Sequence, residues 1–220
     1  GSMEPVKKRM LISTIAIGAA VLSVLAVFWL ASPRVPDART TPGVEATLPG
    51  AGADPYVLDE VGPEVPTLVE YLDFQCPSCA ALHPTVTALR VQYEAKINFV
   101  VRQFPLPGHP HAMDAALAAE AAGQQGRFED MYSKLFENHD EWAAEVGPQA
   151  GTFRNYAEEL GLDLAAYDAA IEDPATSERI QADIDDARRA GAQGTPTFVL
   201  DGEVLQLQEV SDLTDALDSA

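Results

Sequence analysis

Hydrophobic residues follow three different patterns along this chain. No charged residue occurs from Met10 to Ala31, and a helix of that length would be ~33 Å long, enough to cross the hydrocarbon core of a bilayer. The segment 67–74 has the length and the Val, Tyr and Phe content of a strand buried on both faces. Across 111–190, apolar residues recur at helical spacing. These patterns predict a single N-terminal transmembrane helix followed by an α/β domain.

Shorter β-like segments lie on both sides of the helical region. Residues 97–104 form a second apolar run, and 56–61 are a candidate edge strand. Residues 195–207 have a strand, turn and strand pattern centred on Asp201-Gly202, a dipeptide favoured in hairpins. Ser211 is placed to cap a last helix. The predicted order is therefore β-α-β, several helices, and β-β-α.

Capping signals divide the helical region. Asp163 is a candidate N-cap for a helix that stops at Pro174. The next helix is expected to begin at Thr176 or Ser177 and to end at Gly191, since glycine is the preferred residue just past a helix C-terminus.

The first residues set the expected orientation of the chain. Gly1 and Ser2, ahead of Met3, are typical of a tag remnant, and a basic cluster follows at 7–9. Residues 1–9 are therefore interpreted as a tag remnant and a cytoplasmic basic tail. By the positive-inside rule, the segment 10–31 is then a single-pass anchor in the cell membrane, and the domain after it is extracytoplasmic.

A cleaved signal peptide is the alternative to an anchor. The apolar run is longer than the usual length of about 7–15 residues, and Trp29 stands where a small residue is needed for cleavage after Ala31. An uncleaved anchor is therefore favoured. Residues 32–54, rich in Pro, Gly, Ala and Thr, predict a flexible linker, and 55–220 has the length of one domain.

Acidic residues outnumber basic ones by 34 to 14, and the formal net charge is −20. Such a surface disfavours nucleic acid as a partner and favours solubility and repulsion from anionic lipid headgroups. The chain has two cysteines. In a domain expected outside the membrane, they are consistent with an oxidising compartment in which this one pair is the active site.

The cysteines lie in the sequence Cys76-Pro77-Ser78-Cys79, directly after the buried strand. Pro77 indicates that a helix starts here, because proline is tolerated where no backbone N–H is needed. A thiol at a helix N-terminus faces unpaired N–H groups, so the pKa of Cys76 is expected below its usual ~8.5. Cys79 lies one turn later, and the pair can close a disulfide while Cys76 stays open to attack.

Glu70 interrupts the apolar pattern of the buried strand, on the face that carries Leu68 and Leu72. An ionisable group in a central strand costs on the order of several kcal/mol unless it is paired, hydrated or functional. Glu70 is therefore a candidate functional residue.

A metal site and a structural disulfide are the alternatives to a redox pair. His83, four residues after Cys79, can face the same side of the helix, but there is no second cysteine pair, and His109 and His111 lack the spacing of a zinc knuckle. His109 is instead expected to be an exposed loop histidine without a role. A disulfide across so short a loop would stabilise little. We expect a redox-active disulfide, with no metal and no other cofactor.

These motifs resemble the thioredoxin superfamily, and the region from residue 54 onward is similar to the DsbA-like branch of bacterial thiol-disulfide oxidoreductases, in its membrane-anchored or secreted forms. The matching positions are the redox pair, the buried acid before it, the proline that kinks the active-site helix, and the cis-proline loop: Cys76, Cys79, Glu70, Pro84 and Gly194-Thr195-Pro196. The resemblance implies a thioredoxin-like fold with an inserted helical subdomain at about 107–191.

The expected function is that of an enzyme that donates the Cys76–Cys79 disulfide to exported proteins. Glu70 would exchange a proton with Cys79. By resemblance, Thr195 and Pro196 would pair with an extended segment of the substrate. A quinone-linked membrane protein of the DsbB or vitamin K epoxide reductase type would reoxidise the pair.

Two alternatives stay open. If the same site works in the reducing direction, the protein is a reductase, because the motif does not define the direction of electron transfer. A membrane-tethered metallochaperone would use Cys76, Cys79 and His83 as ligands. Ser78 bears on the direction because the more oxidising members of the family have histidine there, so a potential between about −270 and −120 mV is expected.

Overall fold

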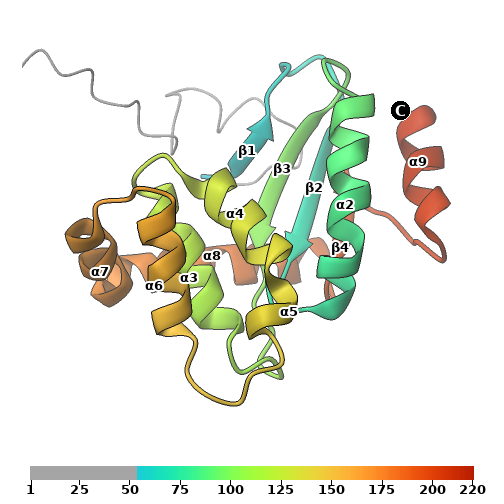
Figure 1. Ribbon diagram of the computed structural model, residues 1–220. Helices are drawn as coiled ribbons and strands as arrows, with labels where there is room; N and C mark the ends of the chain where they lie inside the picture. The colour runs from blue at the N-terminus through green and yellow to red at the C-terminus, as the bar shows by residue number, and fades with distance from the viewer. Residues whose placement is uncertain (1–53) are drawn as a thin grey trace, which may run out of the picture. The chain divides into compact units, whose positions relative to one another are not determined.

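The computed structural model describes residues 54–220, which contain a five-stranded mixed sheet with helices on both faces (Figure 1). In their order across the sheet, the strands are β1 (Tyr56–Asp59), β3 (Asn98–Gln103), β2 (Thr67–Leu72), β4 (Thr197–Leu200) and β5 (Glu203–Val204). β2 and β3 are parallel, and the other neighbouring pairs are antiparallel. The central position of β2 matches its uninterrupted burial, because parallel strands are usually covered on both faces.

Eight helices lie within the described residues: α2 (Pro77–Gln92), α3 (Ala112–Gly123), α4 (Phe128–Glu137), α5 (His139–Trp142), α6 (Ala150–Glu159), α7 (Leu164–Glu172), α8 (Pro174–Ala190) and α9 (Val210–Asp218). Those from α3 to α8 come between β3 and β4. None of the helices in this part of the chain combines the length and apolarity needed to cross a membrane. The expected anchor at 10–31, and all of the expected linker except its last residue, lie outside the described residues.

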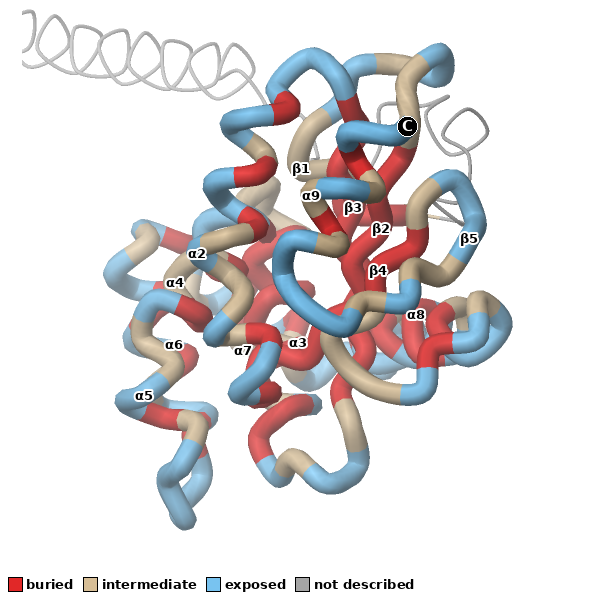
Figure 2. The backbone as a smooth tube through the Cα atoms, turned by 90° about the vertical axis from the view of Figure 1, so that its right-hand side faces the viewer, coloured by how far each residue is buried: buried red, intermediate tan, exposed pale blue. Residues whose placement is uncertain are grey.

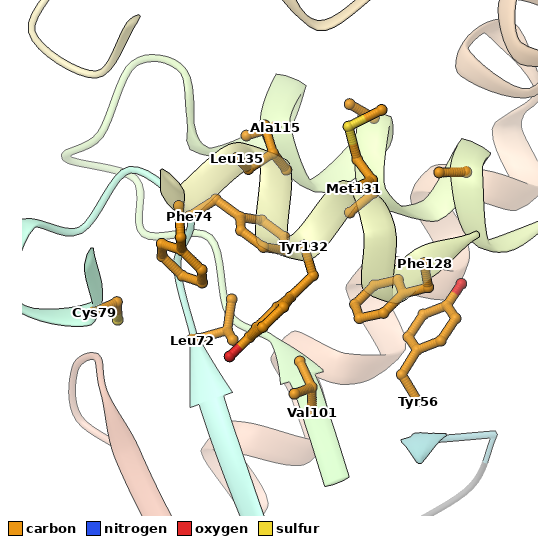
Figure 3. Close-up of a cluster of buried hydrophobic side chains, with 14 of the residues drawn as sticks. Tyr56, Leu72, Phe74, Cys79, Val101, Ala115, Phe128, Met131, Tyr132 and Leu135 are labelled. Atoms are coloured by element: carbon orange, nitrogen blue, oxygen red, sulfur yellow. The ribbon is translucent and has the colours of Figure 1, made fainter. Parts of the chain in front are cut away.

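Each face of the sheet is covered by its own apolar core, and the strands are the buried centre between them (Figure 2). Leu68 and Leu72 point to a core shared with α2, α4 and α9, part of which Figure 3 shows. Val69 and Tyr71 point to a second core that includes apolar residues of α8. The alternation predicted for this strand is therefore confirmed.

The boundary between α7 and α8 corrects one prediction. Asp163 is the N-cap of α7 as expected, and its carboxylate accepts two backbone N–H groups at 2.9 and 3.0 Å. However, α8 begins at Pro174 and not at Thr176 or Ser177. The Asp173 side chain caps it, and proline suits the first helical position because its missing N–H would have no partner there.

The C-terminal elements agree with the expected order and differ in detail. Asp201 and Gly202 have φ of 49° and 86°, so they form the predicted hairpin turn, but β5 after it is only two residues long. Ser211 does not cap α9. Glu209 is the N-cap, and it forms a reciprocal capping box with Asp212.

Candidate active site

β2 leads the cysteine motif to the start of α2. The strand ends at Leu72, two residues earlier than expected, and a turn follows. The backbone N–H of Cys76 donates to the carbonyl of Asp73 at 3.0 Å. Cys76 is the N-cap of α2, and Pro77 is its first residue. The sulfur therefore lies where the predicted helix start places it, beside the unpaired N–H groups of the first turn.

The two cysteines differ in accessibility. Both are free thiols; Cys79 has no exposed surface, and Cys76 keeps 6%. Cys76 is more enclosed than expected because the loop before β4 lies against it. As a thiol, Cys76 donates to the carbonyl oxygen of Thr195 at 3.3 Å. A reagent in solvent can therefore reach Cys76 but not Cys79.

The surroundings of Cys76 favour its thiolate. The largest effect is a hydrogen bond from the Cys79 thiol; burial opposes it, and the backbone N–H groups of Cys79 and Ser78 add to it. Together they lower the pKa of Cys76 from 9.0 to about 5. In the reduced protein Cys76 is therefore ionised at neutral pH.

The pKa values of Cys79 and Glu70 are shifted in the other direction, upward. Burial, the neighbouring Cys76 sulfur and the charge of Glu70 raise the pKa of Cys79, so this thiol keeps its proton. Burial also raises the pKa of Glu70 from 4.5 to about 8, against a smaller opposing effect of Arg90. Glu70 Oε2 has no hydrogen-bond partner. Glu70 is thus a protonated acid at neutral pH, and its charge state is coupled to that of Cys79.

The loop before β4 completes the surface around Cys76. The Thr195-Pro196 peptide bond is cis, as the resemblance implied. Ser78 and Pro196 both line an open cavity of about 570 Å³, together with apolar side chains that include Leu82 and Phe198. An extended, partly apolar segment of another protein can enter this cavity beside the cysteine motif.

A family model described as thioredoxin matches residues 64–219. The chain belongs to the thioredoxin family. A thioredoxin-like oxidoreductase from Silicibacter pomeroyi DSS-3 is similar at 31% identity over 75% of this chain and 91% of that one, with a TM-score of 0.60. Pseudomonas aeruginosa DsbA2 is similar at 25% identity over 74% and 92%, with a TM-score of 0.56. Residues 64–219 are therefore a DsbA-like thiol-disulfide oxidoreductase domain of this superfamily, an enzyme class whose redox centre is a disulfide.

Curated relatives include a Na(+)/H(+) antiporter NhaA 3 from Salinispora tropica, 39% identical over 62% of this chain. The chain spans only about a fifth of the length of that relative.

Gln75 is a site residue of this DsbA-like protein that the sequence did not reveal. It directly precedes Cys76 and is buried. Its Nε2 donates to the carbonyl of Ala143 at 2.8 Å, its Oε1 accepts from the backbone N–H of His111 at 2.6 Å, and its own carbonyl lies 3.0 Å from Nε2 of His139. The residue beside the nucleophile is thus fixed to segments at the start of α3 and around α5, which no local pattern indicates.

His109 is not the exposed, unpartnered loop residue that was expected. Its side chain is 28% exposed, and Nδ1 lies 2.6 Å from Oδ2 of Asp73, a carboxylate with no exposed surface. The available signal was Asp73 itself, a second acidic residue, after Glu70, in a mainly apolar segment.

His83, proposed in the metal alternative, faces an aromatic cluster. Its Nδ1 is 3.3 Å from the hydroxyl of Tyr132, its ring stacks on Phe136 at 4.9 Å, and burial lowers its pKa. Residues 54–220 contain no group of three or more His, Cys, Asp or Glu side chains placed to hold a metal ion.

Proposed function

We propose that the protein works as an oxidase, donating the Cys76–Cys79 disulfide to newly exported proteins. The observation that carries this proposal is the position of the Cys76 sulfur, at the N-terminus of α2 and against the Thr195-Pro196 loop, where its surroundings lower its pKa to about 5. A stable thiolate favours the reduced form of the pair, and a stable reduced form makes the disulfide a stronger oxidant.

The reaction has two exchange steps. A substrate thiolate attacks Sγ of Cys76; the Cys76–Cys79 bond breaks, and Cys79 leaves with the electron pair. A second substrate thiolate then attacks the substrate sulfur bonded to Cys76, which forms the substrate disulfide and releases Cys76 as a thiolate. The substrate loses two electrons, and the cysteine pair gains them.

Glu70 is proposed to supply the proton that Cys79 needs when it leaves. The thiolate of Cys79 is strongly disfavoured in its buried position, and Glu70 is protonated near neutral pH. A proton released by the substrate thiols then returns to Glu70 through solvent. In the reverse direction the same carboxylate would accept the proton.

Substrate binding is proposed at Thr195 and Pro196. Proline leaves no N–H to compete at this edge, so the adjacent backbone can pair with an extended chain. The 570 Å³ cavity beside it is open to the side chains of that chain.

The cellular setting remains a proposal as well. The anchor predicted at 10–31 would hold the domain on the extracytoplasmic side of the cell membrane, where a quinone-linked protein of the DsbB or vitamin K epoxide reductase type would reoxidise it. We also propose that what the chain shares with the antiporters is this oxidoreductase module, and not ion transport. Protease added to intact spheroplasts should cut within 32–54 and release an active domain; protection of that segment would contradict the orientation.

The direction of the reaction is tested by redox equilibrium. The purified protein is equilibrated with glutathione buffers, and its potential is expected above the thioredoxin value of about −270 mV. A potential at or below that value would support the reductase alternative. In parallel, Cys79→Ala incubated with disulfide-bonded client proteins should accumulate mixed disulfides, because its Cys76 thiolate opens the client disulfide and no Cys79 is present to resolve the product. Cys76→Ala should accumulate none, and equal trapping by both variants would contradict the assigned roles.

A further inference from the structure

The side chain of Asp73 is buried, and both of its carboxylate oxygens accept hydrogen bonds. Oδ1 accepts the backbone N–H of Gln75 at 2.8 Å, and Oδ2 accepts that of Leu106 at 2.9 Å. The third partner is His109, whose Nδ1 lies 2.6 Å from Oδ2. A carboxylate can only accept, so Nδ1 carries the hydrogen in this contact. Asp73 therefore ties the turn before α2 to the loop that follows β3.

The backbone of the same residue acts on both cysteines. The carbonyl of Asp73 accepts the N–H of Cys76 at 3.0 Å. Its backbone N–H interacts with the sulfur of Cys79 and lowers the pKa of that thiol against the larger effect of burial. Any shift of Asp73 therefore moves Cys76 and changes the environment of Cys79 together.

We infer that Asp73 and His109 form a positioning pair, which holds the turn 73–76 so that the Cys76 sulfur stays on the N–H groups of α2. The pair acts through Cys76 and does not touch the substrate. Removing the His109 donor leaves a buried carboxylate with one hydrogen bond fewer, so the turn 73–76 is held less firmly. A sulfur that moves off the N–H groups of α2 is less stable as a thiolate, which disfavours ionised Cys76. The inference rests on the proposed redox role of the cysteine pair, but not on its direction.

The test compares two substitutions of similar shape. In His109→Asn, the amide nitrogen takes the place of Nδ1 and keeps the donor, whereas His109→Leu removes it. The thiolate absorbance of Cys76 is titrated, and the glutathione equilibrium is measured. His109→Leu is expected to raise the pKa of Cys76 and to lower the equilibrium constant for reduction by about three- to tenfold, where tenfold corresponds to ~30 mV. His109→Asn should stay within about twofold of the unmodified protein.

Asp168→Asn is the matched control. This carboxylate accepts two hydrogen bonds from Arg154 at 2.8 and 2.9 Å on the exposed side of α6 and α7. Its loss removes a paired charge without touching the turn 73–76, so neither the pKa of Cys76 nor the glutathione equilibrium should change.

The outcomes separate the possible roles. If His109→Leu lowers only the melting temperature and leaves the pKa and the equilibrium unchanged, the pair is structural and the inference is wrong. It is equally wrong if His109→Asn behaves like His109→Leu. Should His109→Leu not fold, His109→Ala replaces it, because a partly exposed site tolerates truncation. An unmodified protein that does not cycle with glutathione would overturn the proposed function itself, whereas unmoved variants of a cycling protein overturn this inference alone.

Discussion

Two buried carboxylates, one on each face of the central sheet, have opposite surroundings. On the face covered by α8, Asp183 lies 2.5 Å from Nη1 of Arg102 and 2.7 Å from Nη1 of Arg179, and it also accepts the backbone N–H of Gln103 at 3.0 Å. On the other face, Oε2 of Glu70 has no hydrogen-bond partner, and burial raises the pKa of this residue to about 8.

The difference distinguishes structural charge from functional charge. Around Asp183 the network pairs the carboxylate with two guanidinium groups and joins α8 to β3, so it supports the fold. Glu70 is disfavoured in its ionised form and therefore keeps its proton near neutral pH. A buried acid that is easily reprotonated suits proton exchange with Cys79, and it weakens the fold when it ionises.

The largest expected effect is that of a substitution at Asp183, the carboxylate with arginine partners. Asp183→Asn removes the carboxylate that lies 2.5 Å from Arg102 and 2.7 Å from Arg179 and leaves Arg102 with Asp186 at 3.3 Å, which should destabilise the protein by roughly 3–5 kcal/mol. Urea unfolding measures this loss. The redox potential of the folded fraction should be unchanged, and a shifted potential would show that the two faces are not independent.

Glu70→Gln should stabilise the protein, whereas Asp183→Asn should destabilise it. Since the pKa of Glu70 is raised from 4.5 to about 8, the stability linked to its neutral form is fully present below about pH 4.5 and is lost as the pH rises through about 8. The variant cannot ionise, so its advantage over the unmodified protein should grow across this pH range. We expect a gain of about 1–3 kcal/mol at pH 8, limited because the amide is also a buried polar group.

The same variant should be the slower enzyme. Without a proton donor at Glu70, the first exchange step, in which the substrate attacks Cys76 and Cys79 leaves, should slow several-fold near neutral pH, while the second step, which releases Cys76, should keep its rate. Stopped-flow measurement of the formation and of the decay of the mixed disulfide with a reduced dithiol peptide separates the two steps. Unchanged kinetics together with higher stability would mean that Glu70 has no part in proton exchange.

Ser78→His tests the effect of a charge at the surface, in contrast to the buried charges at Asp183 and Glu70. Ser78 lies at the surface in the first turn of α2. A protonated imidazole there would stabilise the Cys76 thiolate and raise the potential, and ~30 mV corresponds to roughly 1.4 kcal/mol. Glutathione equilibration at pH 6 and pH 8 is the measurement, and the increase should be larger at pH 6, where more of the imidazole is charged. An equal increase in the potential at pH 6 and pH 8 would show that the charge of the imidazole is not its cause.

The sequence was informative wherever a signal is local. The alternation in β2 placed Glu70 on its correct face, and Pro77 marked the start of α2. The contact between Asp73 and His109 was missed because it joins residues 36 positions apart, and a loop histidine looks the same with or without a buried partner. The start of α8 was missed by two or three residues because Pro174 was interpreted as a stop for one helix and not also as the start of the next.

The contacts of Gln75 have a consequence for protein engineering. A helical segment between two strands is an obvious target for deletion, which would leave a minimal thioredoxin core. It could also be replaced by the equivalent segment of a relative. Here the carbonyl of Ala143 and the N–H of His111 would leave with the excised segment, and the buried amide next to Cys76 would lose both partners. The helical region is thus part of the redox centre, and chimeras should keep Gln75 together with the segments that bind it.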